Sequence, residues 1–308
     1  MVLKPEHRID KPARLKERPF VGRDDLKKIF KEAVKSKIEE RKSGNLQPSV
    51  LMFHGVPGIG KTELRKKLPE ELKSVSMYPV WAALDFRSES YQNMETALFL
   101  ICSILRIRHQ VRFPIFDLAY AVYWKKNHPQ IKLNKETYPY WDEASLVVDI
   151  VKTAAEELTP VGLMIKGAKA ISKSFKAIEK RWTERGIPTL QTLTSMEPYE
   201  IEIELPAFLA MDICNFAGSN NSPIVFFFDT YEFLGKKDAW VQRLVRCLPE
   251  ALFVITGREK LHWIEREKEW ENHIIAHKVL DLPEERSREY LTGCGVENKA
   301  IQKAILGG

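Results

Sequence analysis

Three glycines and a proline precede a Lys-Thr pair in the segment HGVPGIGKTEL, residues 54–64. This spacing matches the pattern G-x-x-x-x-G-K-[ST], whose glycines let backbone N–H groups turn toward anionic oxygens. A helix that begins at the lysine adds the positive end of its dipole at the same place. The segment therefore predicts a phosphate-binding loop (P-loop), with nucleotide contacts from Gly55, Val56, Pro57, Gly58, Ile59, Gly60, Lys61, Thr62 and Glu63.

Two side chains are expected to hold Mg²⁺ beside the phosphates. Lys61 would reach the β- and γ-phosphates, while the Thr62 hydroxyl would be a ligand of the metal. Asp229 follows the apolar run IVFFF and matches the strand-end aspartate that holds Mg²⁺ in NTPases. The alternatives are an accidental Lys-Thr match in a glycine-rich hairpin and an aspartate that only caps a strand. The predicted metal site consists of Thr62 and Asp229.

The acid that would orient an attacking water has several candidates. Many ATPases have a second acid directly after the strand-end aspartate, but here that residue is Thr230. Glu232 is the nearest substitute and Asp85 a weaker one, although Glu232 also fits a solvated loop acid. Arg258, in ITGRE, could contact the γ-phosphate, or it could be a surface arginine. The predicted catalytic residues are Asp229, Glu232 and Arg258.

Strands and helices alternate around these residues, which predicts an α/β fold with a parallel sheet. We expect an exposed helix from about Asp24 and a helix from Lys61 that Pro69 kinks or interrupts. Five apolar segments predict strands, at residues 49–55, 78–86, 224–228, 251–259 and 277–282. About 135 residues separate the second strand from the third, far more than an ordinary crossover needs. Apolar residues at helical spacing predict a helical insertion there, over residues 87–222.

Composition is that of a globular protein. The chain has 308 residues, 44% of them hydrophobic, and a net charge of +6 that is small beside 48 basic and 42 acidic residues. No signal peptide or membrane span is evident, so we expect a cytoplasmic protein without a membrane partner. The four cysteines have no metal-binding spacing and predict reduced, buried thiols, at Cys102, Cys214, Cys247 and Cys294.

The order of motifs resembles that of the STAND NTPases, signal-transduction ATPases related to the AAA+ proteins and including the NACHT and NB-ARC proteins. The segments RPFVGRDDL, GVPGIGKT, FFFDTYE and FVITGR carry the resemblance, which covers roughly residues 18–285 except the helical insertion. It implies a sheet of order 5-1-4-3-2 and a γ-phosphate contact from Arg258. It also implies that the FVGR segment packs near the adenine and ribose, through Phe20, Val21, Gly22 and Arg23.

The same resemblance divides the chain into three predicted parts. Residues 1–44 would be an N-terminal arm and helix, and residues 45–286 the NTPase domain with its insertion. Residues 287–308 would begin a helical lid subdomain, which we expect to be truncated because the chain ends at Gly308, before the family's G-x-P turn. The family's sensor and effector modules would then be missing from this chain or supplied elsewhere.

The expected function is an ATP/ADP switch with slow Mg²⁺-dependent hydrolysis, whose nucleotide exchange is coupled to self-association, in bacterial defence or stress sensing. One alternative is a DNA-associated AAA+-like ATPase of the initiator or loader type. No concentrated basic stripe with interleaved aromatic residues occurs, so we expect no nucleic-acid partner. Two further functions stay open: a module that binds nucleotide without hydrolysing it, and a small-molecule kinase with the insertion as lid. A GTPase is disfavoured because N-K-x-D is absent.

Overall fold

The computed structural model describes residues 19–76, 78–142, 144–154, 158–171, 190–219 and 222–306. The chain divides into two compact units. The larger one spans residues 26–279, and the smaller one joins residues 1–25 to residues 280–308. Residues 1–18, which include most of the predicted N-terminal arm, lie outside the described part of the chain.

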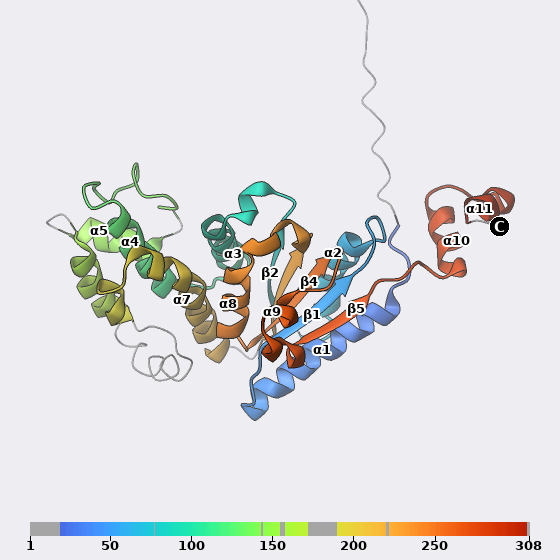
Figure 1. Cartoon of the computed structure of the whole chain (residues 1–308), viewed down its shortest axis with the longest axis horizontal. Helices are drawn as coiled ribbons and strands as arrows, with labels where there is room; N and C mark the ends of the chain where they lie inside the picture. The colour runs from blue at the N-terminus through green and yellow to red at the C-terminus, as the bar shows by residue number, and fades with distance from the viewer. Residues whose placement is uncertain are drawn as a thin grey trace, which may run out of the picture. The chain divides into compact units, whose positions relative to one another are not determined.

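The larger unit contains a five-stranded parallel sheet, so the α/β class is confirmed (Figure 1). The strand order is β2-β3-β4-β1-β5. Each neighbouring pair of strands is parallel, with β1 between β4 and β5, and β3 between β2 and β4. The strands are β1 (Ser49–His54), β2 (Val80–Asp85), β3 (Ile224–Asp229), β4 (Ala251–Gly257) and β5 (Ile274–Lys278).

Burial along the strands follows their place in the sheet. Every residue of β3 and β4 is buried, as expected for inner strands that are covered on both faces. The edge strand β2 alternates between buried and half-buried residues. The other edge strand, β5, has no buried residue. The continuous apolar runs in the sequence therefore mark the inner strands, and the edges carry weaker signals.

The predicted fifth strand at 277–282 is wrong in its bounds, because β5 ends at Lys278. The strand begins earlier, at the apolar residues Ile274, Ile275 and Ala276, which precede the predicted segment. Val279 is buried and its backbone N–H donates to the carbonyl of His54. The segment VLDL, residues 279–282, thus follows the strand and does not belong to it.

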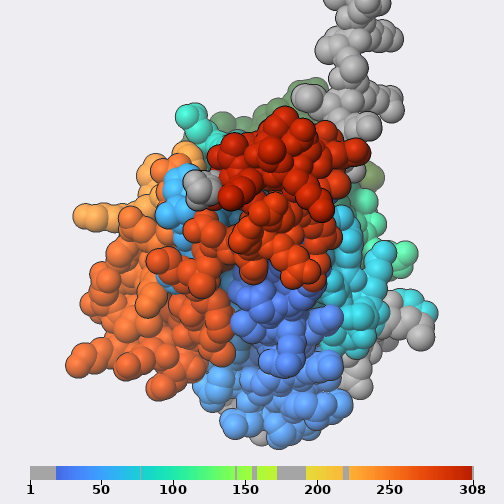
Figure 2. Space-filling view, turned by 90° about the vertical axis from the view of Figure 1, so that its right-hand side faces the viewer, coloured from blue at the N-terminus to red at the C-terminus, as the bar shows by residue number. Residues whose placement is uncertain are grey.

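Helices of the larger unit accompany the sheet. The predicted exposed helix corresponds to α1 (Asp24–Ser43), whose outer surface is seen in blue in Figure 2. Of the two effects predicted for Pro69, a kink or an interruption, the interruption does not occur, because Pro69 lies inside the continuous helix α2 (Lys61–Leu72). The remaining helices near the carboxyl-terminal strands are α8 (Ala239–Cys247) and α9 (Trp263–Arg266).

Between β2 and β3 the described residues form helices and connecting loops, without a strand. Their aromatic and aliphatic side chains continue the core of the sheet. Helix α3 packs on β2, and α7 contacts both α4 and α8 (Figure 1). These helices are α3 (Met94–His109), α4 (Pro114–Asn127), α5 (Ser145–Thr153), a segment over 160–171, and α7 (Pro198–Ser219). Short 3-10 turns occur at Glu89–Gln92, Leu190–Thr194, Gly235–Lys237 and Lys268–Asn272.

The smaller unit contains α10 (Glu284–Gly293) and α11 (Lys299–Ile305). Helix α10 has no buried residue, and α11 exposes Ile301 and Ile305. The prediction of buried thiols is confirmed for Cys102 and Cys247, whereas Cys214 is half-buried and Cys294, which directly follows α10, is exposed. None of the helices in the described part of the chain has the length and apolar character needed to cross a bilayer.

Candidate functional site

A glycine-rich loop joins β1 to α2 at the carboxyl edge of the sheet. Gly58 and Gly60 have φ values of 82° and 95°, a left-handed region in which a side chain would be strained. Gly55 has a different reason to be glycine: a Cβ there would lie 2.8 Å from the carbonyl oxygen of Val279. Three glycines are therefore required by the backbone path of residues 55–60.

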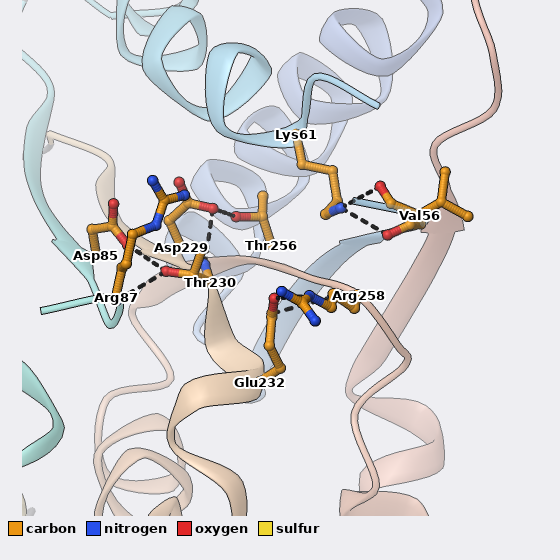
Figure 3. A network of polar contacts seen from close by, with 10 residues as sticks. Val56, Lys61, Asp85, Arg87, Asp229, Thr230, Glu232, Thr256 and Arg258 are labelled. Atoms are coloured by element: carbon orange, nitrogen blue, oxygen red, sulfur yellow. Dashed lines mark hydrogen bonds and ion pairs between the residues drawn. The ribbon is translucent and has the colours of Figure 1, made fainter. Parts of the chain in front are cut away.

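Lys61 begins α2 and turns back over this loop. Its Nζ donates to the carbonyl oxygens of Gly55 at 2.7 Å and Val56 at 2.9 Å (Figure 3). Burial lowers the pKa of Lys61, and Arg258 lowers it further, while Glu232 and Asp229 act in the opposite direction. The ammonium group thus donates to two backbone carbonyl oxygens, and an anionic ligand could replace them as its hydrogen-bond acceptors.

A cavity of about 370 Å³ opens beside Lys61. Its volume lies within the range of small-molecule sites. It combines the loop with the carboxyl ends of β2, β3 and β4, where parallel α/β sheets bind ligands. The lining residues are Pro57, Gly58, Gly60, Lys61, Thr62, Glu63, Arg87, Asp229, Thr230, Glu232, Phe233 and Arg258. The structure thus brings both predicted metal ligands and all three predicted catalytic residues to one cavity.

Asp229 ends β3 and is only 1% exposed. Its Oδ1 accepts hydrogen bonds from the Thr256 hydroxyl and, at 2.9 Å, from the backbone N–H of Thr230. Its Oδ2 is buried and has no hydrogen-bond partner within the described residues. The nearest cationic atom is Nε of Arg65, at 3.7 Å. One carboxylate oxygen is therefore fixed by the protein while the other keeps its acceptor capacity.

Thr230 has a φ of 52°, which is rare for a β-branched residue. Its hydroxyl donates to Oδ1 of Asp85 and accepts from the backbone N–H of Arg87 at 3.1 Å (Figure 3). Burial alone would raise the pKa of Asp85, but hydrogen bonds from Thr230 and Arg87 hold that pKa below its ordinary value. These contacts connect the end of β2 to the end of β3. They also use the Thr230 hydroxyl both as a donor and as an acceptor.

The left-handed Thr230 leads into a 3-10 turn, Tyr231–Phe233, that brings Glu232 back to the cavity. Tyr231 anchors this turn because its hydroxyl donates to the buried carboxylate of Asp238 at 3.3 Å. Glu232 then meets Arg258 twice. Oε1 lies 3.0 Å from the guanidinium Nε, and Oε2 accepts the Arg258 backbone N–H at 3.2 Å. Glu232 and Arg258, two of the three predicted catalytic residues, thus contact each other.

The predicted nucleotide contacts outside this cavity are of two kinds. Gly55, Val56 and Ile59 belong to the glycine-rich loop but do not line the cavity. Phe20, Val21, Gly22 and Arg23 belong to the smaller unit. There Arg23 donates to the carbonyl oxygen of Leu280. Their role at the adenine and ribose stays a prediction.

Three residues of the site were not found by sequence reasoning. Arg87 lines the cavity, Thr256 holds Asp229, and Arg65 faces the same carboxylate from α2. A signal for Arg87 and Thr256 was present, because each lies at the carboxyl end of a predicted strand. Arg65 carries no such signal, since its place depends on how α2 packs against β3.

Comparison with protein-family models and with curated proteins finds no match for this chain.

Proposed function

We propose that this chain binds an adenine nucleotide with Mg²⁺ and acts as a slowly hydrolysing ATP/ADP switch. The observation that carries the proposal is the single cavity shared by the glycine-rich loop, Lys61, Thr62, Asp229, Glu232 and Arg258. A loop with inward-turning backbone, a lysine at a helix start and an arginine opposite them suit a triphosphate. The strand order, which reads 5-1-4-3-2 from the β5 edge, also agrees with the resemblance to STAND NTPases.

The residues present fit a Mg²⁺ ion. Asp229 offers a buried oxygen without a hydrogen-bond partner among the described residues, and Thr62 lines the same cavity. Phosphate-bound Mg²⁺ needs only one or two protein ligands and keeps several waters. This agrees with the described residues, which form no cluster of three or more metal-ligating side chains. The ion would neutralise charge on the β- and γ-phosphates.

Hydrolysis is proposed to be slow because Thr230 and Glu232, the two residues considered for orienting the water, both have other contacts in this conformation. Thr230 has no carboxylate, and its hydroxyl is committed to Asp85. Glu232 is the next acid along the chain after Asp229, but Arg258 contacts both of its carboxylate oxygens. An anionic γ-phosphate would compete for the guanidinium of Arg258, and Glu232 would then be free to contact water.

This competition supports a switch. A triphosphate would separate Glu232 from Arg258, whereas a diphosphate would leave their 3.0 Å ion pair in place. The state of this pair would report which nucleotide is bound. That the exchange is coupled to self-association rests on the family resemblance.

Calorimetric titration of ATP and ADP with Mg²⁺ tests the binding proposal. Lys61→Ala removes a charge-assisted contact worth roughly 1.5–3 kcal/mol, so the affinity for ATP should fall at least about tenfold. Lys67→Ala is the matched control, because Lys67 lies on the same helix, pairs with Glu70 and does not line the cavity. Equal ATP affinity in wild type and Lys61→Ala would refute the assignment. Binding without any phosphate release would instead favour a non-hydrolysing module.

A further inference from the structure

A second cleft, of about 570 Å³, lies in the helical region between β2 and β3. It shares no lining residue with the proposed nucleotide site. One wall comes from the start of α3, another from α4, and the rest from the loop after α4. The lining residues are Glu95, Tyr120, Tyr123, Trp124, Asn127, His128, Glu136, Thr137, Tyr138 and Pro139.

Aromatic rings form a continuous part of this lining. The ring centroids of Tyr120 and Tyr138 are 5.8 Å apart, and those of Trp124 and Tyr138 are 5.5 Å apart. Tyr123 extends the group, with its ring centroid 5.6 Å from that of Tyr120. Aromatic faces carry the negative part of the ring quadrupole and attract cations within about 6 Å. Tyr120 and Tyr138 are only 2% and 3% exposed, whereas Tyr123 is half-buried, so Tyr123 is the tyrosine whose ring a ligand in the cleft can reach.

Glu95 adds a full negative charge to these rings. It lies in the first turn of α3, where the helix dipole favours a carboxylate. Its two oxygens accept hydrogen bonds from Tyr120 at 2.7 Å and from Tyr123 at 3.3 Å. Burial and the neighbouring carboxylates of Glu95 and Glu202 raise the pKa of Tyr123, which keeps that phenol protonated as a donor. The phenols orient the carboxylate without neutralising it.

The described residues supply no cation to balance Glu95. None of their Lys, Arg or His side chains lies within ion-pair distance of it. The nearest lysines along α4 are directed elsewhere: Lys125 Nζ donates to the carbonyl oxygens of Pro129 and Ile131, and Lys126 Nζ to those of Thr194 and Met196. Glu136 adds a second acid to the lining.

One more polar group is left unsatisfied. Tyr138 is 3% exposed, and its hydroxyl has no hydrogen-bond partner within the described residues. A purely structural aromatic core would explain the packed rings. It would not explain why, among the described residues, the Glu95 carboxylate has no counter-ion and the Tyr138 hydroxyl no partner beside an open volume. A buried hydroxyl normally has a hydrogen-bond partner.

We propose that this cleft binds a small methylated ammonium ion, with Glu95 as its counter-charge and the ring of Tyr123 as its π surface. A metal ion is disfavoured because the described residues hold no cluster of three or more ligating side chains. A primary ammonium has three N–H donors that each need an acceptor. A methylated ammonium is weakly hydrated and needs only a counter-charge and a ring face, which Glu95 and Tyr123 supply.

The test uses choline as the probe and 3,3-dimethylbutan-1-ol as its neutral isostere. Calorimetry and ligand-observed saturation-transfer NMR are run on the full chain without nucleotide, so that the outcome does not depend on the proposed ATPase. We expect choline to bind with a dissociation constant below about 1 mM, the weak end of specific binding. The neutral isostere, which has the same shape but no charge, should bind at least about tenfold more weakly.

Matched variants locate the site. Glu95→Gln keeps the shape of the side chain but removes its charge, and should weaken choline binding at least about tenfold. Glu136→Gln makes the same charge change at an exposed lining residue, and should alter affinity by less than about threefold. Tyr123→Phe keeps a ring and should keep most of the affinity, whereas Tyr123→Leu should lose it. Thermal unfolding of each variant verifies that the fold is retained.

Three results would overturn the proposal. The first is the absence of choline binding up to about 10 mM, because a dissociation constant above this value is too weak for a specific site. The second is equal binding of choline and its isostere. The third is wild-type choline affinity in a folded Glu95→Gln variant.

Discussion

Arg258 holds Glu232 through two atoms: its guanidinium Nε lies 3.0 Å from Oε1, and its backbone N–H donates to Oε2 at 3.2 Å. The Arg258 side chain is 55% exposed, whereas the Glu232 side chain is 25% exposed. A ligand that enters the cavity can therefore reach more of the arginine than of the glutamate. We therefore expect an anionic ligand to compete with Glu232 for the Arg258 side chain.

Glu232→Gln should spare ATP binding and remove most of the residual phosphate release, because the amide cannot accept a proton from water. The wild-type turnover itself is expected below roughly 1 s⁻¹, the low end of enzyme rates. Steady-state phosphate release measures both. Glu259→Gln is the control, since Glu259 follows Arg258 in the chain and is exposed but does not line the cavity. A Glu232→Gln variant as fast as wild type would show that another group activates the water.

Asp229→Asn should abolish most of the strengthening of ATP binding by Mg²⁺. The amide can still accept from Thr256 and Thr230, but it lacks the charge that attracts the hydrated ion. ATP titrations with and without Mg²⁺ give the ratio of affinities, which we expect to fall to about threefold or less in the variant. If the ratio equals that of wild type, Asp229 is not a metal residue.

ATP affinity should decrease as pH rises toward the ordinary pKa of lysine, about 10.4. Burial lowers the pKa of Lys61 in the free protein, whereas bound phosphates favour the charged amine and raise that pKa. Protonated Lys61 is therefore linked to binding, and its loss at high pH costs affinity. Lys61→Arg, which stays charged throughout, should give a flatter profile. Identical profiles for the two proteins would exclude Lys61 as the titrating group.

Thr230→Val should lower the free energy of unfolding at pH 7 by about 1 kcal/mol, since it removes the hydroxyl bonded to the partly exposed Asp85. The folded-state pKa of Asp85 lies below its unfolded value. Its stabilisation is therefore present above about pH 3.9 and is lost as pH falls through the lower, folded value. Denaturant unfolding of both proteins at pH 7 and pH 2.5 should show the difference shrinking in acid. An equal difference at both pH values would mean that Asp85 is not involved.

Gly55→Ala should destabilise the protein by about 1–3 kcal/mol, because the added Cβ meets backbone and not a movable side chain. The contact is with the carbonyl oxygen of Val279, at 2.8 Å. Val56→Ala is the control: Val56 is the next residue and 59% exposed, so truncation should change stability by less than about 0.5 kcal/mol. Thermal melts compare the two. Similar melting temperatures for both variants would show that the backbone at Val279 moves to make room for the methyl group.

Local patterns predicted the parts of the site that follow strands or begin helices. Lys61, Asp229 and Arg258 were placed correctly at such ends, because an apolar run followed by a polar residue marks the edge of a parallel sheet. The turn that returns Glu232 to the cavity was not predictable, since it depends on a threonine in a left-handed conformation. The hydrogen bond between Thr256 and Asp229 depends on β3 and β4 being neighbours, which residue order alone does not specify.

The helical region shows the same limit. Periodicity predicted its helices, and α3, α4 and α7 lie where apolar residues recur at helical spacing. The cleft around Glu95 could not be predicted in this way, because its lining comes from three segments that meet only through tertiary packing. Edge strand β5 was misplaced because the prediction began at His277, whereas the strand begins at Ile274, at a sheet edge where burial does not select the residue types.

The pairing of β2 has a consequence for synthesis on the ribosome. In the sheet, β2 pairs only with β3, and residues 86–223 lie between them. At translation rates of about 5–20 residues per second, β2 waits roughly 7–28 s after it leaves the ribosome before its partner exists. During that interval its backbone groups are open to other nascent chains. Early packing of α3 on β2 would shield the strand, so pausing before α3 is translated should increase aggregation, whereas pausing after it should not.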